Sequence, residues 1–214
     1  MTRTALLVAA LALAACGDPG DAPVAETTAV TTADGTLEFT GDAVPLAASD
    51  GVVTWTGAKI TGSHDGGFRD VEGELYLDGD TVTGADVRID AASIYSDDDQ
   101  LTEHLLSPDF FEVETYPEAS FQTTTLRALA PADSVEWAEA THLVTGRLAM
   151  HGQTNEVTFP AIVEVTPQAA TVQAAFNIER DRWGLSYPGA PDDLIHDEVQ
   201  IRIDARADRA PADA

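Results

Sequence analysis

The feature that most limits the fold of this chain is a regular alternation of apolar and polar residues, broken by short turn sequences. In residues 71–90, "VEGELYLDGDTVTGADVRID", the side chains of Val71, Gly73, Leu75 and Leu77 fall on one face. An Asp-Gly-Asp sequence then ends the run, and the alternation resumes behind it. Because successive side chains of a β-strand point to opposite faces, this pattern predicts an antiparallel hairpin with one buried face.

The same pattern recurs along the chain. Residues 142–165 predict a second hairpin, with its turn in the "GQTN" sequence at 152–155, and residues 174–185 and 198–208 predict two further strands. So many strands separated by short turns favour an all-β sandwich or barrel. Periodicity does not choose between the two, although a closed barrel leaves no exposed edge and can hold a cavity.

Residues 96–117 interrupt the alternation and predict a short helix. Leu101 and Leu105 fall on one side of this helix, and Pro108 ends it. Phe110 and Phe111 follow, in a segment that also carries several carboxylates. Three interpretations are open for residues 104–117: a lid over an apolar site, a piece of the core, or a binding surface for a partner.

The N-terminus has the pattern of a bacterial export signal. A short apolar run ends in Leu-Ala-Ala-Cys at 13–16, which resembles a lipobox. The resemblance implies that residues 1–15 are a signal peptide and that Cys16, the single cysteine, is lipidated. A free or nucleophilic thiol is the alternative for Cys16. We therefore expect a membrane-anchored lipoprotein of the periplasm and cell envelope, and Gly17 after the cysteine favours the outer membrane.

Composition divides the rest of the chain. Residues 16–35 are rich in Gly, Pro, Thr, Ala and Asp without apolar periodicity, so they predict a flexible tether. Residues 36–208 predict one β-barrel domain, and 209–214 a C-terminal tail. The formal net charge of −26 argues against a nucleic-acid partner and against electrostatic docking on anionic lipid. Solubility or cation binding could account for this acidity.

Four ordered segments resemble one known family. They are "TWTGAKITGSHDGGF" at 54–68, "VRIDAASIYSDDDQLTEHLLSPDFFEVETYPEASF" at 87–121, "VTGRLAMHGQTNEVTF" at 144–159 and "FNIERDRWGL" at 176–185. Together they resemble the YceI-like family of bacterial envelope proteins over residues 53–207. The resemblance implies a lipocalin-like antiparallel barrel of about eight strands, with a short helix near one mouth. It also implies an apolar lumen for an isoprenoid, quinone-like or other lipid-like chain. A Gly-x-Ser-x-Gly elbow, a glycine-rich phosphate loop and a zinc signature are all missing from the sequence, so we expect neither enzymatic activity nor a further cofactor.

The candidate ligand contacts are side chains expected near the mouth of the barrel or in its lumen. The aromatic candidates, which could equally fill the core, are Phe110, Phe111, Tyr116, Trp55 and Trp183. Arg180 could hold a ligand head group or could form an ion pair. Trp183 stands where the family often has phenylalanine.

Other functions make different predictions. An enzyme acting on a lipid would use His104, His64 and Arg180 at the mouth. A barrel filled by bulky side chains would instead be an interaction module without a ligand, although Gly73 and Gly146 on inward faces favour an open lumen. Metal-ligand spacing is missing among the histidines, and the "SDDDQ" sequence lacks the ligand spacing of a calcium loop. The oligomeric state is open, a homodimer included.

Overall fold

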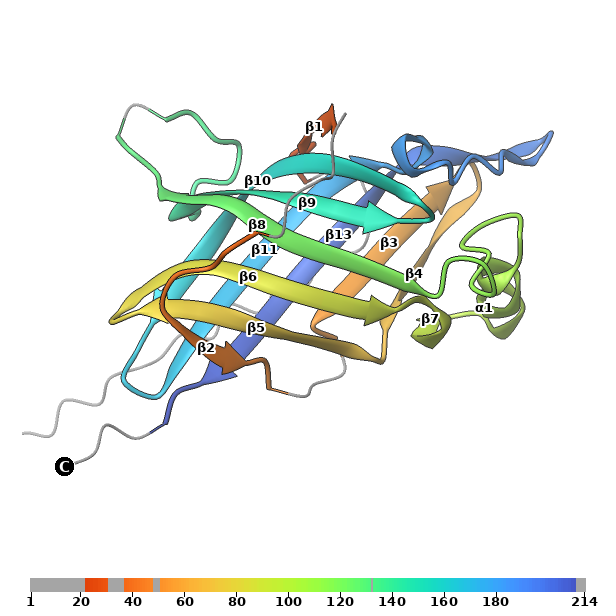
Figure 1. Cartoon of the computed structure of the whole chain (residues 1–214). Helices are drawn as coiled ribbons and strands as arrows, with labels where there is room; N and C mark the ends of the chain where they lie inside the picture. The colour runs from red at the N-terminus through yellow and green to blue at the C-terminus, as the bar shows by residue number, and fades with distance from the viewer. Residues whose placement is uncertain (1–21, 31–36, 48–50, 132, 211–214) are drawn as a thin grey trace, which may run out of the picture.

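The computed structural model describes residues 22–30, 37–47, 51–131 and 133–210. These residues form one strongly curled antiparallel sheet with a single α-helix, α1 (Asp99–Leu106), at one end (Figure 1). The strands of the sheet are β1 (Glu26–Ala29), β2 (Asp42–Pro45), β3 (Val53–Lys59), β4 (Gly62–Phe68), β5 (Val71–Asp78), β6 (Thr81–Asp90), β7 (Ile94–Ser96), β8 (Glu118–Ala128), β9 (His142–Met150), β10 (Gln153–Val165), β11 (Ala169–Glu179), β12 (Gly189–Ala190) and β13 (Asp193–Asp208). Two 3₁₀-helices are η2 (Ala91–Ser93) and η3 (Arg180–Trp183).

The strand order is β2-β5-β6-β8-β9-β10-β11-β13-β3-β4-β7. The curl brings distant parts of this order together, because Leu46, directly after β2, bridges Ala207 near the end of β13. The backbone N–H of Ala47 also donates to the carbonyl of Arg206 at 2.7 Å. The expected lipocalin-like barrel with a short helix at one mouth is therefore confirmed. The described residues contain thirteen strands rather than about eight, partly because β1, β2, β7 and β12 are only two to four residues long.

Both predicted hairpins are present, but the second turn is displaced. The turn between β9 and β10 is centred on His151 and Gly152, whose φ angles are 48° and 71°. Two positive φ values are what a tight two-residue hairpin turn requires, so the strand already begins at Gln153. The predicted strand at 174–185 also ends early, because β11 gives way to η3 at Arg180 and Gly184 turns the chain with a φ of 76°.

Residues 23–29 form an N-terminal strap where the sequence predicted a tether. Strands β10 and β11 pair only over residues 162–165 of β10 and separate toward the start of β10, where β1 pairs instead with residues 155–158. The N–H of Ala25 donates to the carbonyl of Asn177, and the N–H of Asn177 donates to the carbonyl of Pro23. Backbone groups exposed by the split thus find partners in the strap. Residues 1–21, with the predicted signal peptide and Cys16, lie outside the described residues, as do 31–36 and 211–214.

The interior of the barrel contains two packed clusters. The end opposite α1 is filled by small and aliphatic side chains, namely those of Leu75, Leu77, Val82, Ala170 and Ala207. The middle is filled by aromatic rings, with Phe159 and Phe176 stacked at 4.1 Å between ring centroids. Phe121 lies 5.8 Å from Phe159. A Cβ on Gly146 would come within 2.3 Å of the Phe121 ring, so this glycine makes room for the ring rather than for an open lumen.

Candidate functional site

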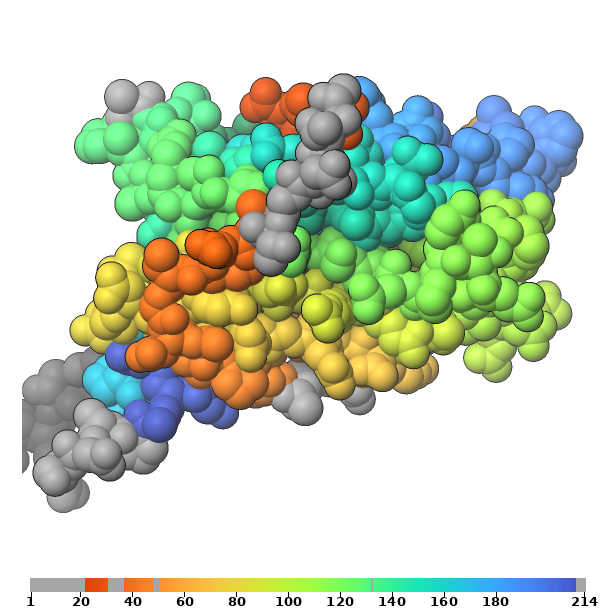
Figure 2. All heavy atoms as spheres, in the orientation of Figure 1, coloured from red at the N-terminus to blue at the C-terminus, as the bar shows by residue number. Residues whose placement is uncertain are grey.

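A cavity of about 460 Å³ opens at the end of the barrel that carries α1. We call it the cup. Its walls come from β3, β4, β7, β9, β11 and β13, and α1 with the turn that follows it covers one side. In the space-filling view the helix and this turn stand as one block at the end of the barrel (Figure 2). Apolar side chains make up most of the lining, including those of Phe68, Leu105, Met150, Ile178, Val199 and Ile201.

Trp55 lies in the deep part of the cup. It pairs in register with Ile201 of β13, which in turn pairs with Phe176 of β11. Its indole lies against Gly66, where a Cβ would approach the ring to 2.3 Å. Trp55 is 8% exposed, and its Nε1–H has no hydrogen-bond acceptor among the described residues. A buried donor without a partner is costly, so a ligand that brings an acceptor to this depth would gain from it.

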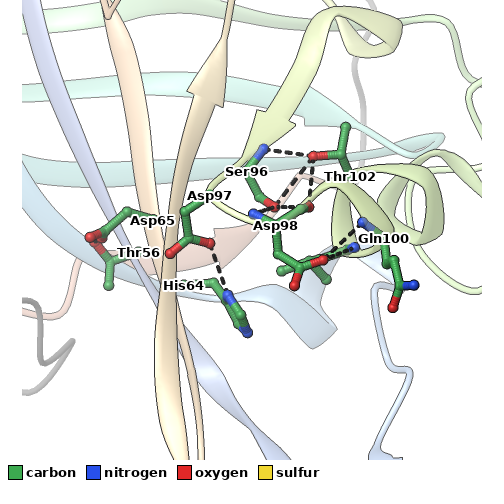
Figure 3. A network of polar contacts seen from close by, with 9 residues as sticks. Thr56, His64, Asp65, Ser96, Asp97, Asp98, Gln100 and Thr102 are labelled. Carbon is green, nitrogen blue, oxygen red and sulfur yellow. Dashed lines mark hydrogen bonds and ion pairs between the residues drawn. The ribbon is translucent and has the colours of Figure 1, made fainter.

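The start of α1 is fixed to the barrel by polar contacts (Figure 3). The Asp98 carboxylate accepts hydrogen bonds from the backbone N–H groups of Gln100 and Leu101, which caps the helix. The bond from Leu101 is the main cause that lowers the pKa of Asp98. One residue earlier, Asp97 contacts His64 Nδ1 of β4 at 2.8 Å. These contacts hold the helix across the mouth of the cup.

The turn after α1 places two aromatic side chains toward the barrel. Phe110 is 7% exposed and packs against the rings of His104, at 5.0 Å, and Tyr187, at 5.2 Å between centroids. Phe111 meets Phe68 of β4 edge-on at 6.1 Å. Of the three interpretations of residues 104–117, the lid over an apolar site therefore agrees best with the structure, although Phe110 also belongs to the core cluster.

Two cationic side chains line the cup among the described residues, and both are engaged. Lys59 Nζ lies 2.7 Å from Asp193, whose pKa is lowered by this bond and by bonds from Thr61. Arg180 is 5% exposed, donates from Nε to the carbonyl of His196 at 3.1 Å and also donates to the carbonyl of Leu185. Burial lowers the pKa of Arg180. Arg180 therefore ties down the loop between η3 and β13.

The cup contains four of the six predicted ligand contacts: Trp55, Phe110, Phe111 and Arg180. The other two lie elsewhere. Tyr116 packs on His151, with 4.6 Å between ring centroids. Trp183 is fully buried and donates from Nε1 to the carbonyl of Leu148 at 2.9 Å.

The histidines considered for an enzyme, His64 and His104, also line the cup. Each contacts its own aspartate, His104 meeting Asp109 at 2.9 Å. Sequence reasoning missed Tyr187 and Met150 as lining residues. Met150 could have been predicted from the sequence, because it ends an alternating run whose other members face inward. Tyr187 lies in a loop without any periodic signal.

The described residues contain neither a cluster of metal-ligating side chains nor a membrane-spanning helix. They contain no group of three or more His, Cys, Asp or Glu side chains placed to hold a metal ion. In the same part of the chain, no helix has the length and apolar character needed to cross a membrane.

An antiparallel barrel with an apolar cup under a short helix defines a lipocalin-like β-barrel protein. More narrowly, the chain belongs to the YceI-like domain family, whose model matches residues 30–207. A UPF0312 protein of Pseudomonas putida strain GB-1 is 29% identical over 144 residues, which cover 64% of this chain and 71% of that protein.

Solved structures support the same fold. A polyisoprenoid binding domain from Saccharophagus degradans superposes with a TM-score of 0.59 at 18% identity, covering 78% of this chain and 98% of that one. BcnA from Burkholderia cenocepacia gives a TM-score of 0.57 at 23% identity, covering 72% and 96%.

Proposed function

We propose that this protein binds and carries a long apolar molecule, an isoprenoid or quinone-like chain, without changing it chemically. The observation that carries the proposal is the cup, an apolar cavity of about 460 Å³ at the lid-covered end of the barrel. Small-molecule sites are typically apolar cavities of ~300–1,000 Å³ with a few polar groups. The similarity to a domain described as polyisoprenoid-binding supports the same class of ligand.

Affinity would come from apolar burial in a preformed site. Each methylene removed from water contributes about 0.8 kcal/mol, so a chain of ten or more carbons supplies ~8 kcal/mol before the cost of immobilising it. Such burial discriminates weakly between similar chains. The length of the cup and the polar groups at its mouth must therefore determine which apolar chains bind.

The mouth favours an uncharged head group. An anionic head group needs a cation with free donors, but Lys59 is paired with Asp193, and Arg180 is engaged by backbone carbonyls. Asp98 adds a further carboxylate to the lining. A phosphate or carboxylate here would lie close to the carboxylates of Asp98 and Asp193, which repel it. A quinone or alcohol head group would avoid this cost and could accept a hydrogen bond.

The proposed place of action is the periplasmic side of the bacterial cell envelope. The lipobox-like sequence before Cys16 supports a lipid anchor on this residue, and Gly17 supports the outer membrane. A carrier anchored in this way would exchange its ligand with the membrane that holds it.

Native mass spectrometry tests the proposal directly. The full chain is expressed with its own N-terminus in a bacterium, extracted from membranes in mild detergent and measured intact. We expect a non-covalent adduct with the mass of an isoprenoid or quinone-like lipid, released by organic solvent. An apo mass, with no uptake when isoprenoid lipids are added, contradicts the carrier function.

The same experiment tests the anchor. A mass increase of several acyl chains on the wild type, absent from the Cys16→Ser variant, is expected. Non-covalent ligand binding should be the same in both proteins when lipid is supplied in detergent.

A second candidate function, an interaction module without a ligand, is favoured by one observation. The aromatic and aliphatic clusters fill the barrel below the cup. An apo mass in the experiment above, with no lipid uptake, would favour this module.

A further inference from the structure

We infer that the cup takes about fifteen carbons of an apolar chain, the size of about three isoprene units, and that any further length of the chain stays outside its interior. The inference rests on the proposed function and adds a limit on the length of the ligand. The limit comes from a floor of aromatic rings, which we define as Phe121, Phe159 and Phe176.

The position of the floor follows from strand register. Ile178 of β11 lines the cup, whereas Phe176, two residues earlier on the same face of the strand, does not. Phe176 is opposite Ile201, and Ile201 is opposite Trp55. Ile201 and Trp55 both line the cup, so its interior ends at this row of side chains.

The floor itself is closely packed. Phe176 and Phe159 are 3% and 2% exposed, and their rings stack at 4.1 Å with an angle of 12° between planes. Phe121 adds a third ring at 5.8 Å from Phe159. The close approach of Phe121 to Gly146 leaves no room even for a methyl group at that point.

Below the floor the barrel is filled again. Leu75 and Leu77 of β5 are 2% and 4% exposed, and they pack with Val82 of β6. Ala170 and Ala207, both 0% exposed, complete this cluster at the end of the barrel opposite α1. A chain that entered at the lid would have to displace both layers to go further.

The size of the cup sets the length of the chain. Its volume of about 460 Å³ corresponds to roughly fifteen groups of the size of a water molecule, at ~30 Å³ each. From Lys59 at the rim to Trp55 at the floor, strand β3 rises about 13 Å at ~3.3 Å per residue. Both values fit a short prenyl chain and not one several times longer.

The test is a length series of prenyl alcohols with two, three, four and eight isoprene units. Each is supplied in the same mild detergent to the full, delipidated protein, and occupancy is measured by native mass spectrometry in competition. Each methylene that enters the cup should lower Kd about fourfold. We expect affinity to rise up to three units and then to level off or fall.

Variants of the floor and the wall move the limit in opposite directions. Phe176→Leu should raise the affinity for the four-unit alcohol relative to the three-unit alcohol by about fourfold, since the smaller side chain leaves space for about one more methylene. Val199→Trp, which fills the cup without removing core atoms, should shift the optimum to two units. Leu77→Ala is the matched control, because it removes a buried side chain far below the floor and should leave the length preference unchanged.

The outcomes separate the two proposals. If none of the alcohols binds, the proposed carrier function fails together with the length limit. If all four bind and affinity keeps rising to eight units in the wild type, only the length limit is overturned. An unchanged length preference in Val199→Trp, with native near-UV circular dichroism, would also overturn it.

Discussion

Replacing Gly146 by alanine should destabilise the barrel measurably, because the space beside this glycine is already occupied. A Cβ at position 146 would come within 2.3 Å of Phe121 Cζ and 2.7 Å of the backbone oxygen of Gln122. Overpacking of this kind costs about 1–3 kcal/mol. The lower backbone entropy of alanine in the unfolded chain offsets ~0.5–1 kcal/mol of this. We expect a net loss of about 1–2 kcal/mol.

Equilibrium unfolding in urea measures this loss. With a slope of ~2 kcal/mol per molar urea, the unfolding midpoint of Gly146→Ala should fall by about 0.5–1 M with the slope unchanged. Gly62→Ala in β4 is the control, since no atom lies within 4 Å of its added Cβ. Its midpoint should stay the same or rise slightly.

A second variant tests whether the added methyl group clashes with the Phe121 ring. Shortening Phe121 to leucine in the Gly146→Ala background should recover part of the loss, giving a coupling free energy of roughly 1 kcal/mol between the two positions. Gly146→Ala could instead be as stable as the wild type, or the effects of the two changes on stability could be additive. Either result would contradict the conclusion that aromatic rings fill the middle of the barrel and would indicate an open lumen there.

Three further predictions follow from buried or capping groups. Trp183→Phe leaves the carbonyl of Leu148 without its donor and should lower the free energy of unfolding in urea by about 1–3 kcal/mol. Ligand affinity should not change, since Trp183 does not line the cup, and a loss of affinity in a fully folded variant would contradict this placement. Arg180→Met removes the donors to the carbonyls of His196 and Leu185, so amide hydrogen exchange in residues 185–196 should accelerate. Unchanged protection of these amides would refute the role of Arg180 in holding the loop. The pKa values of Asp98 and Asp193 are lowered in the folded protein, so their contribution is present above the ordinary carboxyl pKa of about 4 and is lost as the pH falls below it. Amide protection factors in α1 should therefore drop as the pH falls below about 4, and less so in Asp98→Asn. Protection that stays constant in acid would argue against the cap.

The parts of the fold that were predictable depend on side-chain periodicity. Hairpin β5–β6 and strand β13 follow from alternating residues such as Leu75, Leu77, Val199 and Ile201, because burying one face of a sheet dictates a period of two. The helix at 99–106 follows from its leucines and from Pro108, which lies just after its end. The strap was not predictable, because it is held mainly by backbone hydrogen bonds, which leave no pattern in the sequence.

The site was predictable only where its residues lie in periodic or aromatic segments. Trp55, Phe110 and Phe111 all line the cup, Phe110 and Phe111 from the turn after the predicted helix and Trp55 from a strand that the sequence predicts. Trp183 was misplaced because residues 180–183 form η3 instead of continuing the strand. The floor was missed because a single sequence does not tell which inward-facing rings stack across a barrel.

The strap and the segment after β2 also determine when the barrel can close. Glu26 pairs with Thr158, about 130 positions later, and Leu46 bridges Ala207 near the end of the chain. During synthesis these segments emerge first, but their partners are made last. Such a high contact order slows folding and leaves strand edges open in any incomplete chain. A stalled or C-terminally truncated product should therefore be a prime substrate for chaperones and proteases, because the strap and the segment after β2 lack their partners in it.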